Sequence, residues 1–350
     1  MHDPGDIPIF FIIGRPRSGT TLLLKLFDAH PNVIIPWECQ YIVNLYPKYG
    51  KIAKWSRKEL LSFYYDVLAT WQFKVWSIDS KELKKDILSS DPDISYADLC
   101  KKVHLSYQSL YPKEEIRFVG DKNHGYTIYI AKIKEIYPEA KFIYINRDYR
   151  DHFYSIKNVD FELPSISVVT YKWKHFFRKA LQAKEKYPDS IYILRYEDLV
   201  KYPQKKFGEL CDFIGLNFDD SVMNFHRKKD EHLELFQSEE VYRHHKSLMQ
   251  PLNTKRIGLW KKHLSAREVR IADCIANKYA EKGGYIRIYD KCGFLTCLLS
   301  LPGIFYAKFL YIMTHIIDHF PYKLRALLLN KGPLFLARMF MKISGRKTKA

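Results

Sequence analysis

Short and almost continuous hydrophobic runs alternate along the chain with longer stretches in which apolar residues recur every three or four positions. The runs have the length of strands, are rich in Ile, Val, Tyr and Phe, and lack the alternation of a strand with one face in water. They lie at Ile9–Ile13, Ile116–Gly120, Lys141–Asn146 and Ser190–Tyr196. Strands of this kind, buried on both faces, are typical of a parallel sheet.

The longer stretches predict helices between these strands. They lie at Thr20–His30, Tyr126–Tyr137, Ser165–Tyr187, Tyr202–Ile214 and Ser265–Lys282. The alternation predicts an α/β protein with a P-loop-like three-layer fold and a central, mainly parallel sheet, in which ligands bind at the carboxyl ends of the strands. A helical, aromatic-rich insert at about residues 51–112 separates the first run from the second, and such inserts often cover an active site.

The pattern changes after Asp290. Residues Cys292–Ile317 contain one Lys, one His and no acid, and Pro302-Gly303 is expected to break them into halves too short to span a membrane. Residues Tyr322–Ala350 mix Leu, Phe and Met with eight basic residues. We expect residues 291–350 to form a helical C-terminal extension, which either associates with an anionic membrane or packs on the domain with a solvated basic face.

The charge is strongly basic, at +18 overall with a pI near 9.4, which indicates an anionic partner. Residues 291–350 hold ten Lys or Arg against one acid, and so supply half of the excess. The six cysteines lack metal-ligand spacing and are predicted to be reduced thiols of a cytoplasmic protein. The segment MHDPGDIPIF has no basic n-region, so a signal peptide is not expected.

The segment GRPRSGTT has the glycine spacing of a phosphate-binding loop, from Gly14 to Gly19. Thr20 stands where a nucleotide hydrolase has Lys, and no run of apolar residues ends in a clear magnesium-binding Asp, so ATP or GTP chemistry loses support. Arg15 and Arg17 can instead grip a phosphate or sulfate. The alternative is a tight strand-to-helix turn without a ligand.

A second candidate anion site lies in FIYINRDYRDHFYSIKN, residues Phe142–Asn158. Arg147 follows the end of a predicted strand, and Ser155 lies eight residues later, about two turns into a predicted helix. Both side chains can therefore reach one anion.

Four segments in a fixed order carry a resemblance to a known family. They are GRPRSGTTLL, NRDYRDHFYS, LRYEDLVKYPQKKFGELCDFIGL and NTKRIGLWKKHLS. Together they resemble the sulfotransferases that use 3′-phosphoadenosine-5′-phosphosulfate (PAPS), especially the bacterial and protein-tyrosine branches. The resemblance runs from about Ile7 to Tyr285, so we expect a PAPS-binding domain at residues 1–290 and an extension at 291–350.

The resemblance implies roles in holding the donor. The 5′-phosphosulfate cradle would comprise Arg17, Ser18, Gly19, Thr20 and Thr21, with Arg15 added from the loop itself. Arg147 and Ser155 would hold the 3′-phosphate, and Tyr196 would lie near the adenine. Lys255 and Arg256 would close over the donor, with Lys246 as an alternative.

The resemblance also implies catalytic roles. Glu38 matches the catalytic glutamate of the bacterial and protein-tyrosine branches and is favoured as the base, with His124, which has the spacing of the cytosolic branch, as acceptor contact or alternative base. Lys122 would neutralise charge on the transferring group. Taken as isolated residues, Glu38 and His124 would be solvated or helix-capping groups and Lys122 a surface lysine. No metal is expected.

The acceptor is predicted from weaker signals. Aromatic residues of the insert either pack in the core or line an apolar acceptor pocket: Trp55, Phe63, Tyr64, Tyr65, Trp71, Phe73 and Trp76. With the basic tail, they favour a hydrophobic alcohol such as a sterol, lipid or glycolipid, presented at the inner membrane face. A carbohydrate or a peptide tyrosine is the alternative acceptor. A P-loop kinase or NTPase, and a membrane-binding module without turnover, are the alternatives of other classes. No nucleic acid partner is expected.

Overall fold

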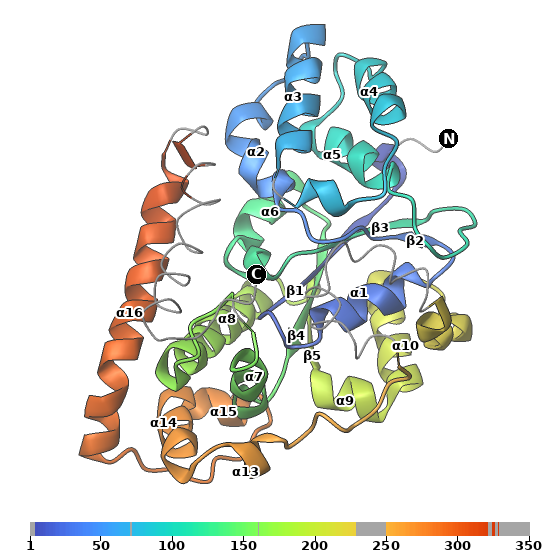
Figure 1. Cartoon of the computed structure of the whole chain (residues 1–350). Coiled ribbons are helices and arrows are strands. Elements are labelled where there is room, and N and C mark those ends of the chain that lie inside the picture. Colours follow the sequence, from blue (N-terminus) through green and yellow to red (C-terminus); the bar gives the residue numbers. More distant parts are fainter. Residues whose placement is uncertain are drawn as a thin grey trace. The chain divides into compact units, whose positions relative to one another are not determined.

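The computed structural model describes residues 4–70, 72–159, 161–228 and 250–320, together with Leu324, Arg325 and Leu328. The chain forms two compact units, coloured along the sequence in Figure 1. Unit 1 consists of Met1–Ile145 and Gln182–Asn253. Unit 2 consists of Asn146–Leu181 and Thr254–Ala350.

The sheet has five strands in the order β2-β3-β1-β4-β5. The strands are β1 (Ile9–Gly14), β2 (Val33–Ile34), β3 (Phe118–Lys122), β4 (Lys141–Asn146) and β5 (Ile191–Arg195). β1 pairs in parallel with both β3 and β4, and β2 pairs in parallel with β3. The predicted α/β fold with a central parallel sheet is confirmed. The predicted second strand began two residues too early, and β2 was missed because two residues are too few to form a hydrophobic run.

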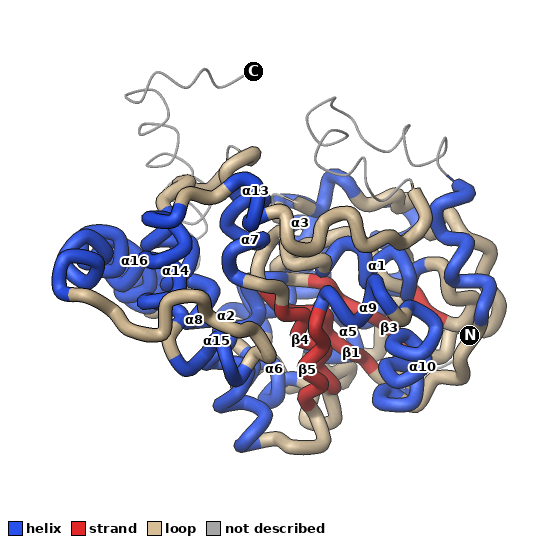
Figure 2. The backbone as a smooth tube through the Cα atoms, turned by 90° about the horizontal axis from the view of Figure 1, so that it is seen from below, coloured by secondary structure: helices blue, strands red, loops and turns tan. Residues whose placement is uncertain are grey.

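The central strand β1 is buried on both faces because neighbouring side chains enter different layers of unit 1. The ring of Phe10 lies 4.7 Å from that of Phe27 in α1 (Thr20–Asp28). The ring of Phe11 stacks on Phe142 at 5.3 Å and lies 6.1 Å from that of Tyr126 in η3 (His124–Ile128). The strands therefore lie in the middle of unit 1 with helices on both sides (Figure 2).

Unit 1 contains further described helices, four of which lie in the predicted insert. They are η1 (Pro4–Asp6), α2 (Tyr41–Tyr49), α3 (Arg57–Ala69), η2 (Phe73–Val75), α4 (Ser80–Leu88), α5 (Tyr96–Leu105), α6 (Ile130–Ile136), α9 (Tyr196–Lys201), α10 (Pro203–Ile214) and η4 (Asp220–Lys228). The insert separates β2 from β3. Trp55, Phe63, Phe73 and Trp76 are buried, whereas Tyr65 is exposed and Trp71 lies outside the described residues.

Unit 2 is helical. Its elements are α7 (Tyr149–Ile156), the part of α8 (Ile166–Lys186) up to Leu181, α13 (Trp260–His263), α14 (Ala266–Ala276), α15 (Lys278–Lys282) and α16 (Phe294–Asp318). Trp173 is fully buried in this unit. Asp273 of α14 accepts hydrogen bonds from the Tyr149 hydroxyl and, at 2.8 and 3.0 Å, from the backbone N–H groups of Ile288 and Tyr289. These bonds fix the chain that leads to α16.

The expected break at Pro302-Gly303 is wrong, because α16 runs without interruption from Phe294 to Asp318. Proline inside a helix removes one backbone hydrogen bond, which packing against a neighbour can offset. The missing side chain of Gly303 permits such packing, since a Cβ there would lie 2.5 Å from the Cβ of Ser167 in α8.

The prediction of reduced thiols is wrong for one pair. Cys274 and Cys292, whose Cα atoms are 5.0 Å apart, form a disulfide between α14 and the start of α16. Their spacing of 18 residues gave no signal, since only the fold places the two together. The cysteines therefore no longer support a cytoplasmic location.

Replacing Cys274 with Ser is expected to lower the free energy of unfolding by roughly 3 kcal/mol, because the disulfide closes a short loop of the unfolded chain. Urea unfolding without reductant measures the loss. The matched control is Cys297→Ser, since Cys297 is an exposed free thiol. An unchanged urea midpoint for Cys274→Ser would contradict the stabilising role.

Candidate active site

The glycine loop leaves β1 with a backbone that only glycine adopts without strain. Gly14 has φ 144°, and a Cβ there would lie 2.7 Å from the carbonyl oxygen of Ile145. Its N–H donates to the Thr127 hydroxyl at 3.1 Å. Within the loop, the Ser18 N–H donates to the Arg15 carbonyl at 3.2 Å, and Arg17 has a left-handed φ of 68°. Such strain in a non-glycine residue is typical of functional loops.

The N-terminus of α1 faces this loop without a side-chain cap. Gly19, at φ 104°, is the N-cap residue and α1 begins at Thr20. A Cβ on Gly19 would lie 2.7 Å from the Tyr196 ring, so this ring covers the end of the loop. Thr20 is buried and Thr21 is half-buried. The N–H groups of the first helical turn and the helix dipole suit an anion.

The predicted catalytic residues meet in a cluster of three side chains. The Glu38 carboxylate lies 2.7 Å from the Lys122 Nζ and 3.0 Å from the His124 Nδ1. Gln72, a residue of the insert, donates to the same carboxylate at 3.3 Å. The exposed fractions of the side chains are 13% for Glu38, 8% for Lys122 and 31% for His124. His124 is therefore the member most open to solvent.

Glu38 is ionised in this cluster. Burial raises the pKa of Glu38, but the neighbouring His124 and Lys122 outweigh that effect and hold the pKa far below its ordinary value. A buried carboxylate is tolerated when opposite charge and hydrogen bonds compensate its desolvation. Glu38 therefore has the charge of a base at neutral pH, and Lys122 supplies a cation in contact with it.

The sheet brings the cluster to the glycine loop. Lys122 ends β3 and pairs with Ile12 of β1, two residues before Gly14. Glu38 follows β2, and its neighbour Trp37 is held by the insert, since the Trp76 indole donates to the Trp37 carbonyl at 2.7 Å. Glycine loop and cluster therefore both lie at the carboxyl ends of neighbouring strands, as an α/β fold predicts.

A buried network behind the cluster was missed in the sequence. Asp121 and Asn123 alternate with Lys122 and His124, and alternate residues point to opposite sides of an extended segment. Asp121 lies 3.2 Å from His104 Nε2, and the Nδ1 of the same ring lies 2.6 Å from the Tyr41 hydroxyl. Asn123 donates to the Asp121 carboxylate and, at 3.1 Å, to the carbonyl of the residue after Glu38. The polar alternation in DKNH was the available signal.

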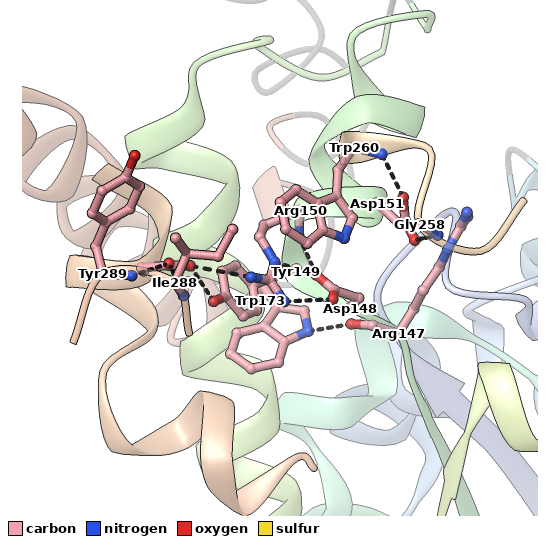
Figure 3. Close-up of polar contacts among 11 residues, drawn as sticks. Arg147, Asp148, Tyr149, Arg150, Asp151, Trp173, Gly258, Trp260, Ile288 and Tyr289 are labelled. Atoms are coloured by element: carbon pink, nitrogen blue, oxygen red, sulfur yellow. Dashed lines mark hydrogen bonds and ion pairs between the residues drawn. The ribbon is translucent and has the colours of Figure 1, made fainter. Parts of the chain in front are cut away.

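In unit 2, Arg147 contacts the predicted closing residue Arg256 and lies near Gly258 (Figure 3). Arg147 is buried and donates from Nη2 to the Arg256 carbonyl at 2.8 Å, while its own carbonyl accepts from the Trp173 indole at 2.9 Å. Asp151 of α7 accepts from the N–H groups of Gly258 and Trp260 at 2.6 and 2.9 Å. These bonds hold the segment after Arg256 against α7.

A buried arginine, Arg150, also holds the segment after Arg256 against α7. Arg150 makes a bidentate ion pair with Asp148 at 3.0 and 2.8 Å, and its guanidinium stacks 4.0 Å from the Trp260 ring. The roles of Asp148 and Asp151 were missed, although their spacing of three residues at a helix start was visible in RDYRDHF.

The remaining predicted donor-binding residues differ in how far they are exposed. Ser155 lies half-buried on α7, Lys255 is exposed, and Lys246 lies outside the described residues. The glycine loop, Tyr196 and the cluster belong to unit 1, whereas Arg147, Ser155 and the closing segment belong to unit 2. Their joint action on one donor stays a prediction.

Comparison with known proteins identifies the family. The sequence model of the sulfotransferase family matches residues 8–220. The chain belongs to this family. The matched range contains the glycine loop, the cluster and Arg147, so this sulfotransferase carries its predicted site residues up to Tyr196 within the family domain.

Two curated relatives are similar to this sulfotransferase over most of its length. Protein-tyrosine sulfotransferase 1 of Danio rerio is 26% identical over 261 residues, which are 73% of this chain and 66% of the relative. The omega-hydroxy-beta-dihydromenaquinone-9 sulfotransferase Stf3 of Mycobacterium bovis is 25% identical over 252 residues, 60% of this chain and 63% of the relative. The chain thus spans somewhat less than two thirds of either relative.

A solved structure agrees in fold. The sulfotransferase domain of the Synechococcus PCC 7002 olefin synthase matches with a TM-score of 0.51 and 18% identity, covering 77% of this chain and 94% of that domain. The similarity supports the α/β architecture assigned to unit 1.

Proposed function

We propose that this sulfotransferase moves the sulfuryl group of PAPS to the hydroxyl of a hydrophobic alcohol and releases adenosine 3′,5′-bisphosphate. The observation that carries the proposal is the Glu38, Lys122 and His124 cluster at the strand ends beside the glycine loop. In this proposal the cluster supplies a charged base and a cation beside the anion cradle, as transfer of a sulfuryl group to a hydroxyl requires.

The residues of both units fit the donor. In unit 1 the close backbone at Gly14 and Gly19, and the uncapped start of α1, suit the phosphosulfate, with Arg15, Arg17 and Ser18 in the same loop. The Tyr196 ring, which lies against Gly19, suits the adenine. In unit 2, Arg147 and Ser155 suit the 3′-phosphate, with Lys255 and Arg256 closing over it.

The cluster would carry the chemistry. Glu38 takes the proton from the acceptor hydroxyl, whose oxygen forms the new S–O bond while the bond from sulfur to the bridging oxygen of the donor breaks. Lys122 stabilises the negative charge that develops near the sulfuryl group. His124, the most exposed of the three, contacts the acceptor and orients the Glu38 carboxylate.

His124 is the second candidate for the base. Glu38 receives hydrogen bonds from three side chains, which reduces its basicity, and a histidine oriented by a carboxylate is a common general base. The two assignments differ in how much turnover a Glu38→Gln variant retains.

The acceptor is proposed from the insert and the relatives. An aromatic residue of the insert contacts the segment that holds Glu38, since the Trp76 indole donates to the Trp37 carbonyl, and the mycobacterial relative is named for a menaquinone-derived hydroxyl. The zebrafish relative is named for protein tyrosine, which supports a peptide tyrosine as the second candidate. Both acceptors present a hydroxyl on a largely apolar group.

Mass spectrometry tests the proposal directly. A lipid extract and a tyrosine-containing peptide library are each incubated with the protein and PAPS, and products heavier by one sulfuryl group are sought. Products in the lipid extract support the hydrophobic alcohol, and products among the peptides support tyrosine. Turnover of ATP with magnesium and no sulfated product in either would overturn the proposal.

Replacing Arg147 with Ala is expected to weaken binding of adenosine 3′,5′-bisphosphate by roughly 10- to 100-fold, the value of one charge-assisted contact. Titration calorimetry measures the affinity. Arg267→Ala, which removes an exposed arginine of unit 2, is the matched control. Equal affinity of the Arg147 variant and the native chain would disprove the 3′-phosphate assignment.

A further inference from the structure

Helix α16, the long orange helix in Figure 1, carries a stripe of exposed apolar residues along its length. The exposed fractions of Phe305, Phe309 and Ile312 are 63%, 52% and 58%. The stripe comprises Leu295, Leu298, Leu299, Phe305, Phe309, Ile312 and Ile316, and from Phe305 onward its members are three or four residues apart. A stripe of this length on one helix face exceeds what a monomer normally leaves in water.

The opposite face of α16 is made of small residues and packs within unit 2. Thr296, Ser300 and Ala307 are buried, and a Cβ at Gly303 would collide with Ser167 of α8. Farther along, the Tyr311 ring stacks 4.1 Å from the ring of His175 in α8. The disulfide at Cys292 anchors the start of the helix. The large side chains therefore point outward because the small ones already face the unit.

Among the described residues, α16 is the one helix long and apolar enough to cross a membrane, with a mean hydropathy of 1.5 over its best window and 11% of that window buried. Crossing would require the middle of the helix, at Gly303 and Tyr311, to leave α8. Lying along a membrane surface requires no such separation, because only the exposed stripe has to enter the lipid.

The charge of residues 291–350 favours an anionic surface. Residues 291–350 contain ten Lys or Arg, and their one acid, Asp318, is paired with Arg325 at 3.6 Å. Lys291 before the helix and Lys308 within it are both exposed. An anionic bilayer offers apolar chains for the stripe and negative head groups for these cations, and lysine can extend its ammonium group to the head groups.

We propose that α16 is an interfacial helix that lies in the plane of an anionic lipid bilayer with its exposed stripe inserted. The proposal does not depend on the identity of the acceptor or the donor, because it rests on the surface of unit 2. The sequence predicted membrane association for residues 291–350 as a whole, and the proposal assigns that association to the exposed face of α16.

Vesicle sedimentation of the full chain tests this placement. The native chain is expected to bind vesicles of phosphatidylcholine and phosphatidylserine, and to bind phosphatidylcholine alone much more weakly. Phe305→Glu combined with Phe309→Glu is expected to reduce binding to the anionic vesicles by roughly tenfold or more, because two aromatic side chains that would enter the lipid are replaced by charges.

The matched control is Ile286→Glu combined with Ile288→Glu, which places the same charges on exposed apolar positions of unit 2 outside the stripe. This control is expected to bind several-fold more tightly than the stripe variant. Thermal unfolding of both variants checks that the fold is retained. Equal vesicle binding by stripe variant and control would overturn the proposal, as would absence of binding by the native chain.

Two further measurements test whether the stripe is covered by something other than a membrane surface or belongs to a helix that spans the membrane. Alkaline carbonate is expected to release the bound native chain, whereas retention would indicate a spanning helix and contradict the in-plane placement. Light scattering is expected to give the same mass for native chain and stripe variant. A dimer that the stripe substitutions dissociate would assign the stripe to a second copy, and vesicle binding only after removal of residues 329–350 would assign it to that tail.

Discussion

Glu38→Gln is expected to lower kcat by roughly 10²- to 10⁴-fold, because the amide cannot accept the proton of the acceptor hydroxyl. Binding of adenosine 3′,5′-bisphosphate should be nearly unchanged, since the glycine loop and Arg147 are untouched. Turnover with the acceptor found by mass spectrometry measures the first effect, and titration calorimetry measures the second. Together the two measurements distinguish a defect in the chemical step from a defect in donor binding.

The pH dependence follows from the lowered pKa of Glu38. A carboxylate whose pKa is depressed in the folded state adds stability above its unfolded pKa and loses it as pH falls through the folded pKa. Glu38 is therefore ionised throughout the range from about pH 5 to pH 8, and protonation of Glu38 should cause no loss of rate there.

Glu139→Gln provides the matched control, because Glu139 is an exposed glutamate of unit 1 away from the cluster. It should leave kcat unchanged. Near-normal kcat for Glu38→Gln, together with loss of turnover in His124→Asn, would assign the proton to His124 instead. The assignment of the base thus depends on two variants and not on one.

Lys122→Met is the second substitution with a large expected effect, a decrease in kcat of roughly 10²- to 10³-fold. It removes the cation 2.7 Å from Glu38 that is proposed to stabilise the sulfuryl group. The same change raises the pKa of Glu38, because one of the two neighbours that lower it is lost. The acid side of the pH–rate profile should therefore move to higher pH.

Stability controls accompany this variant, because an uncompensated buried carboxylate can cost about 3–5 kcal/mol. Lys122→Arg keeps the charge and should retain more turnover than Lys122→Met. Lys132→Met, which breaks a surface pair with Glu135, should leave both turnover and stability nearly unchanged. If Lys122→Met left kcat unchanged but weakened donor binding, Lys122 would bind the donor without acting on the transition state.

The sequence predicted the parts of the fold that depend on local pattern. Continuous apolar runs marked four of the five strands, and the glycine spacing of GRPRSGTT marked the loop before α1. The family resemblance brought Glu38, Lys122 and His124 forward as candidates. It could not show that their side chains meet, because Glu38 is 84 and 86 residues from its two partners.

Predictions from the sequence were wrong or missing where the structure depends on residues that are distant in the sequence. Pro302-Gly303 breaks an isolated helix, yet α16 continues because α8 lies against the glycine. Cys274 and Cys292 lacked any spacing signal, yet the fold brings them into bonding distance. The buried network behind the cluster pairs Asp121 of the DKNH segment with His104, and no sequence signal pointed to His104.

What the sequence by itself determined about this protein is its α/β pattern, its anion-binding loop, its family resemblance and its basic C-terminal region. These features depend on residue type and on spacing between residues that are close in the sequence. The tertiary structure decided the contact of Glu38 with Lys122 and His124, the cover of Gly19 by Tyr196, the disulfide, and the side of α16 that is exposed. Such contacts depend on strand order and on which face packing has already covered, and neither is written in a local pattern.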